Sequence, residues 1–280
     1  MQRGDVWEIE SKTARGKVHR LMCGDSTSAA DVAKLMGGKR AQAVLSDVPY
    51  GMDLDTDWSD IQGSLRQSSA KNHTRGNKYE RVKGDDKPFD PSPIFEMFGY
   101  CKEIFLFGAD YYAEKIPNRT NGSWVVWDKR KESQSEAIGA EFELIWSKAK
   151  HKRRVLRHDW FGFLSSQNGK DARNRQHPTQ KPVSLIVEII NQWIDAGQII
   201  FDGYLGSGTT MVGAEQAGRV CYGLEIEPHY CSVILERMRL LGLSPRLIKE
   251  PSSKNIRLDM TRAAKRNEVG QRVGVVGVGK

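Results

Sequence analysis

The segment from Asp202 to Thr210 has the residue types and the spacing of a nucleotide-binding turn. It reads DGYLGSGTT, follows an apolar stretch at 198–201 that predicts a buried strand, and precedes a stretch up to Ala217 that predicts a helix. Glycines let the backbone of such a turn come close to a ligand, and the amino end of the helix offers free N–H groups. The strand, turn and helix together indicate a binding site for a nucleotide-like cofactor.

The details of this turn narrow the kind of cofactor. A phosphate-binding P-loop needs lysine after its last glycine, but Thr209 stands there. The dinucleotide fingerprint needs a third glycine where Met211 stands. A cofactor that carries a ribose but no phosphate therefore fits better. Glu225 ends the next predicted strand, where its carboxylate is able to accept hydrogen bonds from both ribose hydroxyls.

Three motifs, taken in their chain order, resemble those of a known enzyme family. FDGYLGSGTT at 201–210 resembles the motif that binds S-adenosylmethionine in amino-methyltransferases. HPTQKP at 177–182 resembles the segment that lines the methionine end of that cofactor, and SDVPYG at 46–51 resembles the catalytic Asp-Pro-Pro-Tyr motif. With the catalytic motif first and the cofactor turn last, the chain over roughly residues 18–240 resembles the beta, circularly permuted group of DNA amino-methyltransferases.

This resemblance implies a Rossmann-like α/β fold, with a doubly wound, mostly parallel, seven-stranded sheet and one antiparallel edge strand. Residues 1–250 are expected to form a single domain, with a catalytic half at 18–147, a basic DNA-recognition insert at 148–176 and a cofactor-binding half at 177–241. The basic tail at 251–280 is expected to be poorly ordered. Strands that alternate with helices in the first half of the sequence also predict a parallel sheet covered on both faces.

The resemblance also implies what the site residues do. In the motif Asp47-Val48-Pro49-Tyr50, the carboxylate of Asp47 and the carbonyl of Val48 accept the hydrogens of an exocyclic amine and free its lone pair to attack a sulfonium methyl group. Tyr50 stacks on a base that has left the helix, a contact typically worth ~1–3 kcal/mol. No metal is needed. The implied S-adenosylmethionine contacts are Asp47, Thr179, Lys181, Asp202, Tyr204, Gly206, Ser207, Gly208, Thr209 and Glu225.

Two positions depart from the family pattern. Val48 replaces a proline, which keeps the carbonyl but loses the rigidity of the turn, and Gly203-Tyr204 replaces Pro-Phe while keeping an aromatic ring. Adenine N6 is the predicted target because the catalytic motif begins with Asp, whereas cytosine N4 enzymes of this group more often begin with Ser. The alternatives are cytosine N4 methylation, a DNA-binding relative impaired in catalysis because of Val48, and methylation of RNA or protein.

A basic segment with aromatic residues, Ser147–Arg175, lies between the two predicted halves. Clustered cations followed by Trp160, Phe161 and Phe163 are typical of a surface that binds nucleic acid. A net charge of +8 and a pI of about 9.3 suit a polyanionic partner such as double-stranded DNA. The predicted phosphate contacts are Lys152, Arg153, Arg154 and Arg157.

Composition excludes other classes of protein. The longest apolar runs are far too short to span a membrane, and the amino-terminal residues lack the apolar core of a secretory signal. The four cysteines form no CxxC pair, which predicts reduced thiols in a cytoplasmic protein and no zinc site. The family resemblance implies that the cell is a bacterium or a phage-infected host. A homodimer and a restriction endonuclease partner are both compatible with the sequence.

Overall fold

The fold is that of a computed structural model, which describes residues 1–54, 81–129, 140–158 and 180–248. Met1–Arg246 form one compact unit. The strands are β1 (Val6–Glu10), β2 (Val18–Cys23), β3 (Ala43–Ser46), β4 (Glu103–Phe107), β5 (Ser123–Asp128), β6 (Phe142–Ser147), β7 (Arg154–Arg157), β8 (Ile199–Asp202), β9 (Val220–Glu225) and β10 (Pro245–Ile248). The helices are α1 (Ala29–Met36), α2 (Ser92–Phe98), α4 (Val183–Trp193), α5 (Thr209–Gln216) and α6 (Pro228–Leu240), with short 3₁₀ turns η2 (Ala113–Lys115) and η3 (Arg119–Asn121).

The strands form one mixed sheet in the order β10-β1-β2-β9-β8-β3-β4-β6-β5-β7. The five central strands, from β2 to β4 in that order, are parallel. Strand β6 runs antiparallel to both of its neighbours, and β7 runs parallel to β5. The α/β class and the largely parallel sheet that the sequence predicted are therefore confirmed.

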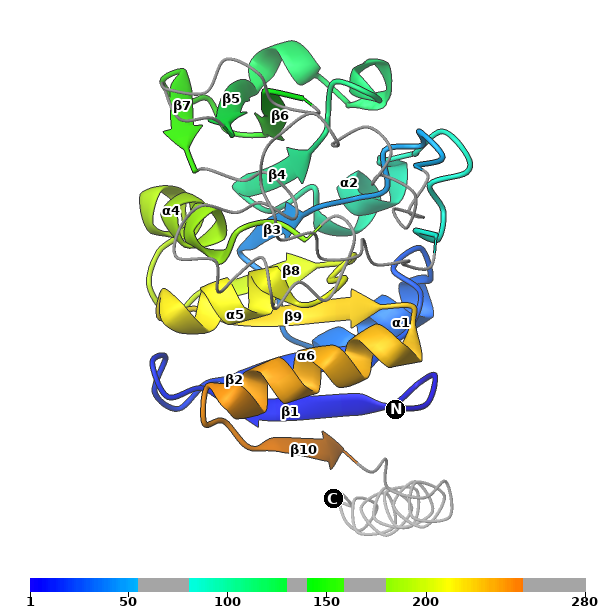
Figure 1. Cartoon of the computed structure of the whole chain (residues 1–280), viewed down its shortest axis with the longest axis vertical. Helices are drawn as coiled ribbons and strands as arrows, with labels where there is room; N and C mark the ends of the chain where they lie inside the picture. The colour runs from blue at the N-terminus through cyan, green and yellow to red at the C-terminus, as the bar shows by residue number, and fades with distance from the viewer. Residues whose placement is uncertain (55–80, 130–139, 159–179, 249–280) are drawn as a thin grey trace, which may run out of the picture. The chain divides into compact units, whose positions relative to one another are not determined.

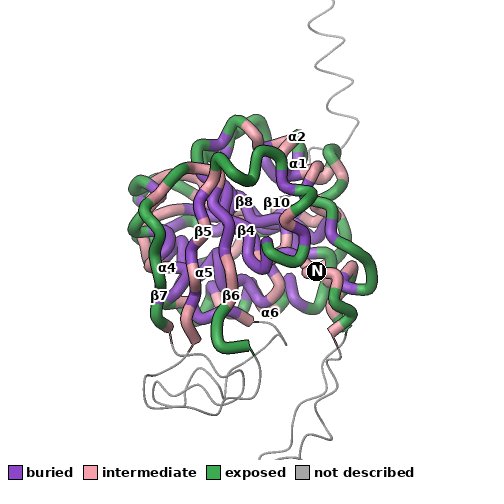
Figure 2. The backbone as a smooth tube through the Cα atoms, turned by 90° about the horizontal axis from the view of Figure 1, so that it is seen from above, coloured by how far each residue is buried: buried purple, intermediate pink, exposed green. Residues whose placement is uncertain are grey.

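Helices cover both faces of the sheet. Figures 1 and 2 show α4, α5 and α6 on one face and α1 and α2 on the other, with the buried strands between them. Helix α4 turns four large aliphatic side chains inward at helical spacing, Leu185, Ile186, Ile189 and Ile190. Within the residues that the structure describes, no helix is long and apolar enough to cross a membrane.

The boundary between β8 and β3 is the point at which the chain changes faces. Strand β8 leads into α5 on one face, whereas β3 leads toward α2 on the other (Figure 1). In open α/β sheets the crevice at the carboxyl ends of two such strands is where ligands bind. A ligand site is therefore expected beside Ser46 and Asp202, the last residues of β3 and β8.

The sheet differs from the predicted one in two respects. It has ten strands in the described part of the chain instead of seven, because β1 and β10 extend one side and β7 extends the other. Strands β1 and β6 both run antiparallel to the central strands, and neither is at an edge, because β1 lies between β10 and β2 and β6 lies between β5 and β4. Strand β7 lies within the predicted insert at 148–176, so part of that segment belongs to the sheet itself.

Candidate active site

The ends of β3 and β8 bring two distant motifs together. The hydroxyl of Ser46 donates a hydrogen bond to Oδ1 of Asp202 over 2.9 Å and accepts one from the backbone N–H of Gly203 over 3.3 Å. Asp47 follows Ser46 directly, so the predicted catalytic motif begins beside the predicted cofactor turn. The structure therefore has the adjacency that the predicted chemistry requires.

Three polar side chains gather beside the carboxylate of Asp47. The ammonium of Lys181 lies 2.9 Å from Oδ1 of Asp47, and the hydroxyl of Tyr50 donates to the same oxygen over 2.9 Å. Glu143, on β6, places its Oε2 3.3 Å from the Lys181 nitrogen and 3.2 Å from the Tyr50 hydroxyl. We call Asp47, Tyr50, Glu143 and Lys181 the carboxylate cluster.

The hydrogens available to this cluster define how it is ordered. The three hydrogens of the Lys181 ammonium meet three acceptors, which are Asp47, Glu143 and, at 3.1 Å, the hydroxyl oxygen of Tyr50. Tyr50 has a single hydroxyl hydrogen, so it donates to Asp47 or to Glu143 but not to both at once. Lys181 is therefore the fixed centre of the cluster, and Tyr50 has a choice between the two carboxylates.

Burial and charge shift the pKa values of the cluster in different directions. Burial raises the pKa of Asp47 despite the pull of Lys181, and the like charge of Glu143 adds to the rise. Burial also acts to raise the pKa of Glu143, but Lys181 and Lys129 outweigh it and lower that pKa. Burial would lower the pKa of Lys181, but the two carboxylates raise it. Asp47 is thus the carboxylate better suited to take up a proton.

The backbone after the catalytic motif is held by a carboxylate. Asp85, 6% exposed, accepts hydrogen bonds from the N–H groups of Gly51 at 2.8 Å and Leu54 at 2.9 Å. Gly51 has a φ of +77°, and a Cβ there would lie 2.7 Å from the carbonyl oxygen of Lys87. These contacts hold the turn that follows Val48, whose side chain is buried.

The ring of Tyr50 already has an aromatic neighbour. Tyr111 stacks on it with ring centroids 5.3 Å apart and planes inclined by 14°. Tyr111 is 56% exposed, while the backbone at Gly108 approaches the Tyr50 ring so closely that a Cβ would lie 2.3 Å from it. A base that stacks on Tyr50 therefore has to meet Tyr111.

The glycine turn between β8 and α5 is shaped by its left-handed residues. Gly206 and Gly208 have φ values of +51° and +83°, and Gly208 caps the amino end of α5. Asp202 accepts from the backbone N–H of Tyr204 over 3.0 Å, and burial raises the pKa of Asp202 to about 6. The hydroxyl of Ser207 donates to Oε1 of Gln180 over 3.1 Å, which joins the turn to the segment before α4.

Glu225, at the end of β9, is bound to the same turn. Its Oε2 accepts from the N–H of Gly206 over 2.7 Å, and its Oε1 accepts from the N–H of Glu227 over 2.8 Å. The residue is 7% exposed, and burial raises its pKa to about 7. Each carboxylate oxygen keeps acceptor capacity for a further donor, and Glu225 is the last residue of β9.

Comparison with known proteins bears on what this arrangement is for. Residues 125–236 match the model of the N6_N4_Mtase family, described as DNA methylase. The chain is similar to this family over these residues, which make up less than half of its length. It is 39% identical over 145 residues to YubD of Escherichia coli (strain K12), covering 48% of this chain and 62% of YubD. It is 29% identical over 114 residues to the type II methyltransferase M2.LlaDCHI of Lactococcus lactis subsp. cremoris, covering 41% and 40%. The alignment to the crystal structure of M1.HpyAVI covers 78% of this chain and 97% of the M1.HpyAVI chain, with a TM-score of 0.47 and 14% identity.

The region matched to the DNA methylase family covers only part of the site. The alignments span less than two thirds of the length of these two curated relatives. The family match contains Glu143, Lys181, the glycine turn and Glu225, but it begins after Asp47. In the structure, the contacts of Lys181 with Asp47 and of Ser46 with Asp202 join the catalytic motif to the matched region.

The other predicted site residues lie in different places. Lys181 was predicted near the cofactor and lies against Asp47, within the carboxylate cluster. Ser207 is buried in the glycine turn, and Thr209, the first residue of α5, is also buried. The ring of Tyr204 packs edge-on against Phe89, with centroids 5.7 Å apart. Thr179 lies outside the described residues.

The predicted phosphate contacts lie on and before the edge strand β7. All four side chains, Lys152, Arg153, Arg154 and Arg157, are exposed. Arg157, at the carboxyl end of β7, lies 3.7 Å from Asp128 of β5. Because β7 runs parallel to β5 and four residues of strand span about 13 Å, Lys152 and Arg157 lie near opposite edges of the sheet.

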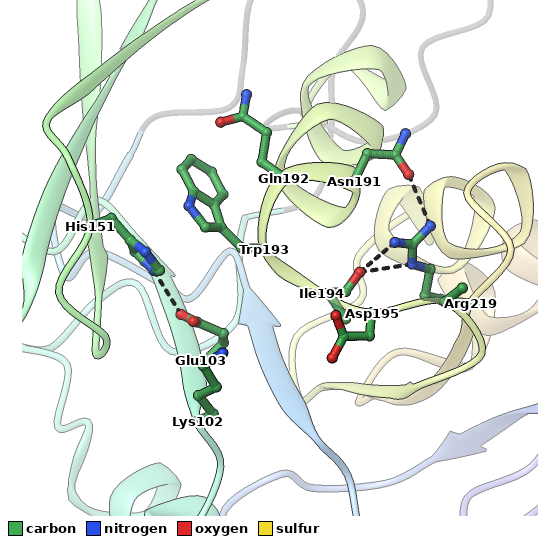
Figure 3. Close-up of a pocket in the computed structure, with 10 residues that line it drawn as sticks. Lys102, Glu103, His151, Asn191, Gln192, Trp193, Ile194, Asp195 and Arg219 are labelled. Carbon is green, nitrogen blue, oxygen red and sulfur yellow. Dashed lines mark hydrogen bonds and ion pairs between the residues drawn. The ribbon is translucent and has the colours of Figure 1, made fainter.

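A separate pocket of about 400 Å³ lies at the amino ends of the parallel strands (Figure 3). Its polar groups bind one another. Glu103, the first residue of β4, is 3.0 Å from His151, and the guanidinium of Arg219 donates to the carbonyl oxygen of Ile194 and the side chain of Asn191. This pocket therefore lies at the edge of the sheet opposite the carboxylate cluster.

Four residues of the site were not predicted from the sequence, namely Asp85, Tyr111, Lys129 and Glu143. Glu143 had a signal, since it is an acid within the apolar stretch FELIW. An acid in a strand that is otherwise apolar needs a partner when buried, and here the partners are Lys181 and Lys129. The other three had no distinguishing pattern, because they lie in polar or turn segments.

Proposed function

We propose that the protein is an S-adenosylmethionine-dependent DNA methyltransferase that acts on the exocyclic amine of an extruded base, adenine N6. The observation that carries the proposal is the adjacency of Asp47 and Asp202 through Ser46 at the switch point of the sheet. The match of residues 125–236 to the DNA methylase family supports the reaction class and the substrate. An amine bound at Asp47 and a methyl donor bound along the glycine turn would then face each other.

The residues of the glycine turn fit the proposed cofactor. Glu225 offers acceptors for ribose hydroxyls, Tyr204 offers a ring near the nucleoside, and the free N–H groups at the amino end of α5 suit a carboxylate. A Cβ at position 208 would lie 2.8 Å from Ile234, and one at 203 would lie 2.9 Å from Ser26, so glycine alone keeps the turn this tight. S-adenosylmethionine would supply a methyl group on a positively charged sulfur, which an amine can attack directly.

The chain's own residues would position the amine and take its proton. Lys181 and Tyr50 both bind Oδ1 of Asp47, so the amine is expected at Oδ2, with its second hydrogen on the carbonyl of Val48. As the nitrogen–carbon bond forms and the carbon–sulfur bond breaks, the amine gives up one proton. Asp47 would accept that proton, because burial raises its pKa. Tyr50, fixed through its hydroxyl, would stack on the base.

The test is direct identification of the methylated base. Purified protein is incubated with S-adenosylmethionine and unmethylated duplex DNA, and the nucleosides are identified by mass spectrometry. N6-methyladenine is expected from the natural protein, and none from Asp47→Asn, which loses the carboxylate that takes the amine proton. N4-methylcytosine alone would make cytosine the target. Product from Val48→Pro alone would show that the natural chain binds DNA without catalysis.

A further inference from the structure

Lys129 and Glu143 form an ion pair beside the proposed catalytic groups that the reaction itself does not use. Lys129 follows β5, and Glu143 lies on the neighbouring strand β6. The two charges are 2.5 Å apart, and both side chains are largely buried, with 16% and 18% of their surface exposed. A buried charge pair needs more than one partner to offset its desolvation, and Glu143 has three: Lys129, Lys181 and Tyr50.

We propose that Glu143 is a positioning residue, which stays ionised, fixes the Lys181 ammonium and the Tyr50 hydroxyl in place and shares them with Asp47, and that Lys129 controls how large a share Glu143 takes. This inference rests on the proposed function and deepens it. Glu143 binds Lys129 through Oε1 and the cluster through Oε2, so its two oxygens have separate tasks. Lys181 therefore divides its attraction between Asp47 on one side and Glu143 on the other.

Among the described residues, the titratable groups that face Asp47 come from several elements. Lys181 precedes α4, Glu143 comes from β6, Tyr50 from the catalytic motif itself, Tyr112 from the turn after β4, and Asp202 from β8. Lys181 is the cation among these, and Glu143 and Asp202 are the like charges. Removing the charge of Glu143 takes a like charge away from Asp47 and also lets Lys181 interact more strongly with Asp47. Both effects lower the pKa of Asp47.

Two substitutions are expected to move the titration of Asp47 in opposite directions. Glu143→Gln keeps the size and the acceptor but removes the charge, so Asp47 loses a like charge and gains a larger share of Lys181. Its pKa should fall by about one unit. Lys129→Met frees Glu143 from its second cation, so Glu143 attracts Lys181 more strongly and the pKa of Asp47 should rise by about half a unit.

The experiment has one readout that does not depend on activity. The carboxyl signal of Asp47 is identified by NMR from its absence in Asp47→Asn and is titrated in the natural protein and in both variants. The pH profile of kcat is measured in parallel on duplex DNA. The control is Glu96→Gln, an exposed acid on α2, which should leave both curves in place. A second variant, Glu143→Ala, should lower kcat about 10²-fold, because groups misplaced by about an ångström cost that much.

The proposal is supported if the pKa of Asp47 falls in Glu143→Gln and rises in Lys129→Met, and if the rising limb of the pH profile of kcat shifts in the same way. Shifts of the same sign in Glu143→Gln and Lys129→Met, or no shift in Glu143→Gln, overturn it. A melting temperature and a cofactor affinity that fall in step with kcat in Glu143→Ala, beside a normal Glu143→Gln, would reduce Glu143 to a structural residue. If the natural protein methylates no DNA, the proposed function fails, while the NMR titration still decides the role of Glu143.

Discussion

Ser46 and Asp202 lie 156 residues apart in the chain and share a hydrogen bond of 2.9 Å at the carboxyl ends of neighbouring parallel strands. Both side chains are buried, so neither can exchange this contact for water at no cost. The bond joins the end of the catalytic strand to the first residue of the glycine turn. It therefore fixes the distance between the two halves of the proposed site.

Removing that bond should weaken both the fold and the proposed cofactor site. Ser46→Ala takes a donor from Asp202 and an acceptor from Gly203, and the free energy of unfolding is expected to fall by about 1–3 kcal/mol. The pKa of Asp202, which burial raises to about 6, should rise further because the bond from Ser46 lowers it. Chemical denaturation measures the first effect and calorimetry with S-adenosylmethionine the accompanying loss of affinity. Ser232→Ala, an exposed serine on α6, is the control. Equal stability of the two variants would show that the bond contributes nothing.

Local elements of the fold could be predicted from the sequence because their patterns are local. Val183 to Trp193 has apolar residues at helical spacing and forms α4 with those bounds, and EIFLF forms β4. Which strands pair could not be predicted, since β6 enters between β4 and β5 through contacts that no short pattern encodes. The prediction of one antiparallel strand at the edge was therefore wrong, because β1 and β6 are both antiparallel and both lie inside the sheet.

The candidate site shows the same division. Asp47 and Glu225 stand at the carboxyl ends of apolar stretches, and parallel strands bring such ends to one edge of the sheet, so their shared edge could be predicted. The position of Lys181 beside Asp47 could not be predicted, because it depends on how the segment before α4 crosses the sheet. Glu143 reaches both Lys181 and Tyr50 from β6, a strand whose place in the sheet no local pattern indicates.

Glu225 should make cofactor binding depend on pH. Burial raises its pKa to about 7, so the carboxyl group is increasingly neutral below that pH. Ribose hydroxyls donate best to the ionised form, and the affinity for S-adenosylmethionine is therefore expected to fall, by up to about tenfold per unit, as the pH drops below 7. It should level off above that pKa. Glu225→Gln should bind weakly at every pH, and calorimetry between about pH 5.5 and 8.5 measures both. Equal affinity of the natural protein about one pH unit below and above the pKa would contradict this role.

Glu215 should stabilise the fold in a way that acid removes. Its carboxylate accepts from Ser11 over 2.5 Å and from His19 over 2.9 Å, and His19 must donate there because its Nδ1 accepts from the backbone N–H of Cys221. Burial acts against the charge, but these bonds lower the pKa of Glu215 to about 2. A lowered carboxyl pKa adds stability above the ordinary value of 4.5, and this stability is lost as the pH falls toward 2. The melting temperature of Glu215→Gln should therefore be lower at neutral pH and change less as the pH falls to about 2.5. If the melting temperatures of the natural protein and of Glu215→Gln changed by the same amount over this pH range, the assignment would be contradicted.

Tyr111 should compete with the extruded base for the ring of Tyr50. The two rings are stacked at 5.3 Å, and such pairs contribute about 0.5–1.5 kcal/mol. Tyr111→Ala removes the competitor, so KM for duplex DNA is expected to fall several-fold while kcat stays within about threefold. Tyr111→Phe keeps the ring and should behave as the natural protein. A rise of KM in Tyr111→Ala would instead mean that Tyr111 itself binds the DNA.

The basic residues of the β7 edge should contribute to DNA binding through phosphates. Lys152, Arg153, Arg154 and Arg157 are exposed, and each phosphate contact releases counterions, which makes affinity fall with salt. Changing any one of them to alanine is expected to reduce the slope of log K against log salt concentration by about 0.9, similarly for all DNA sequences. Arg157→Ala also loses an exposed ion pair with Asp128, which contributes little to stability.

Lys152 and Arg153 precede β7, whereas Arg154 and Arg157 are its first and last residues, so their contributions to the affinity should differ with position. Arg157 lies at the carboxyl edge, which it shares with Asp47, and its loss should weaken binding more than the loss of Lys152 at the amino edge. Lys39→Ala, an exposed lysine after α1, is the control. Fluorescence anisotropy of a labelled duplex at several salt concentrations measures each slope. If Arg157→Ala and Lys39→Ala give the same slope as the natural protein, DNA does not approach the site across β7, and the basic edge serves another purpose.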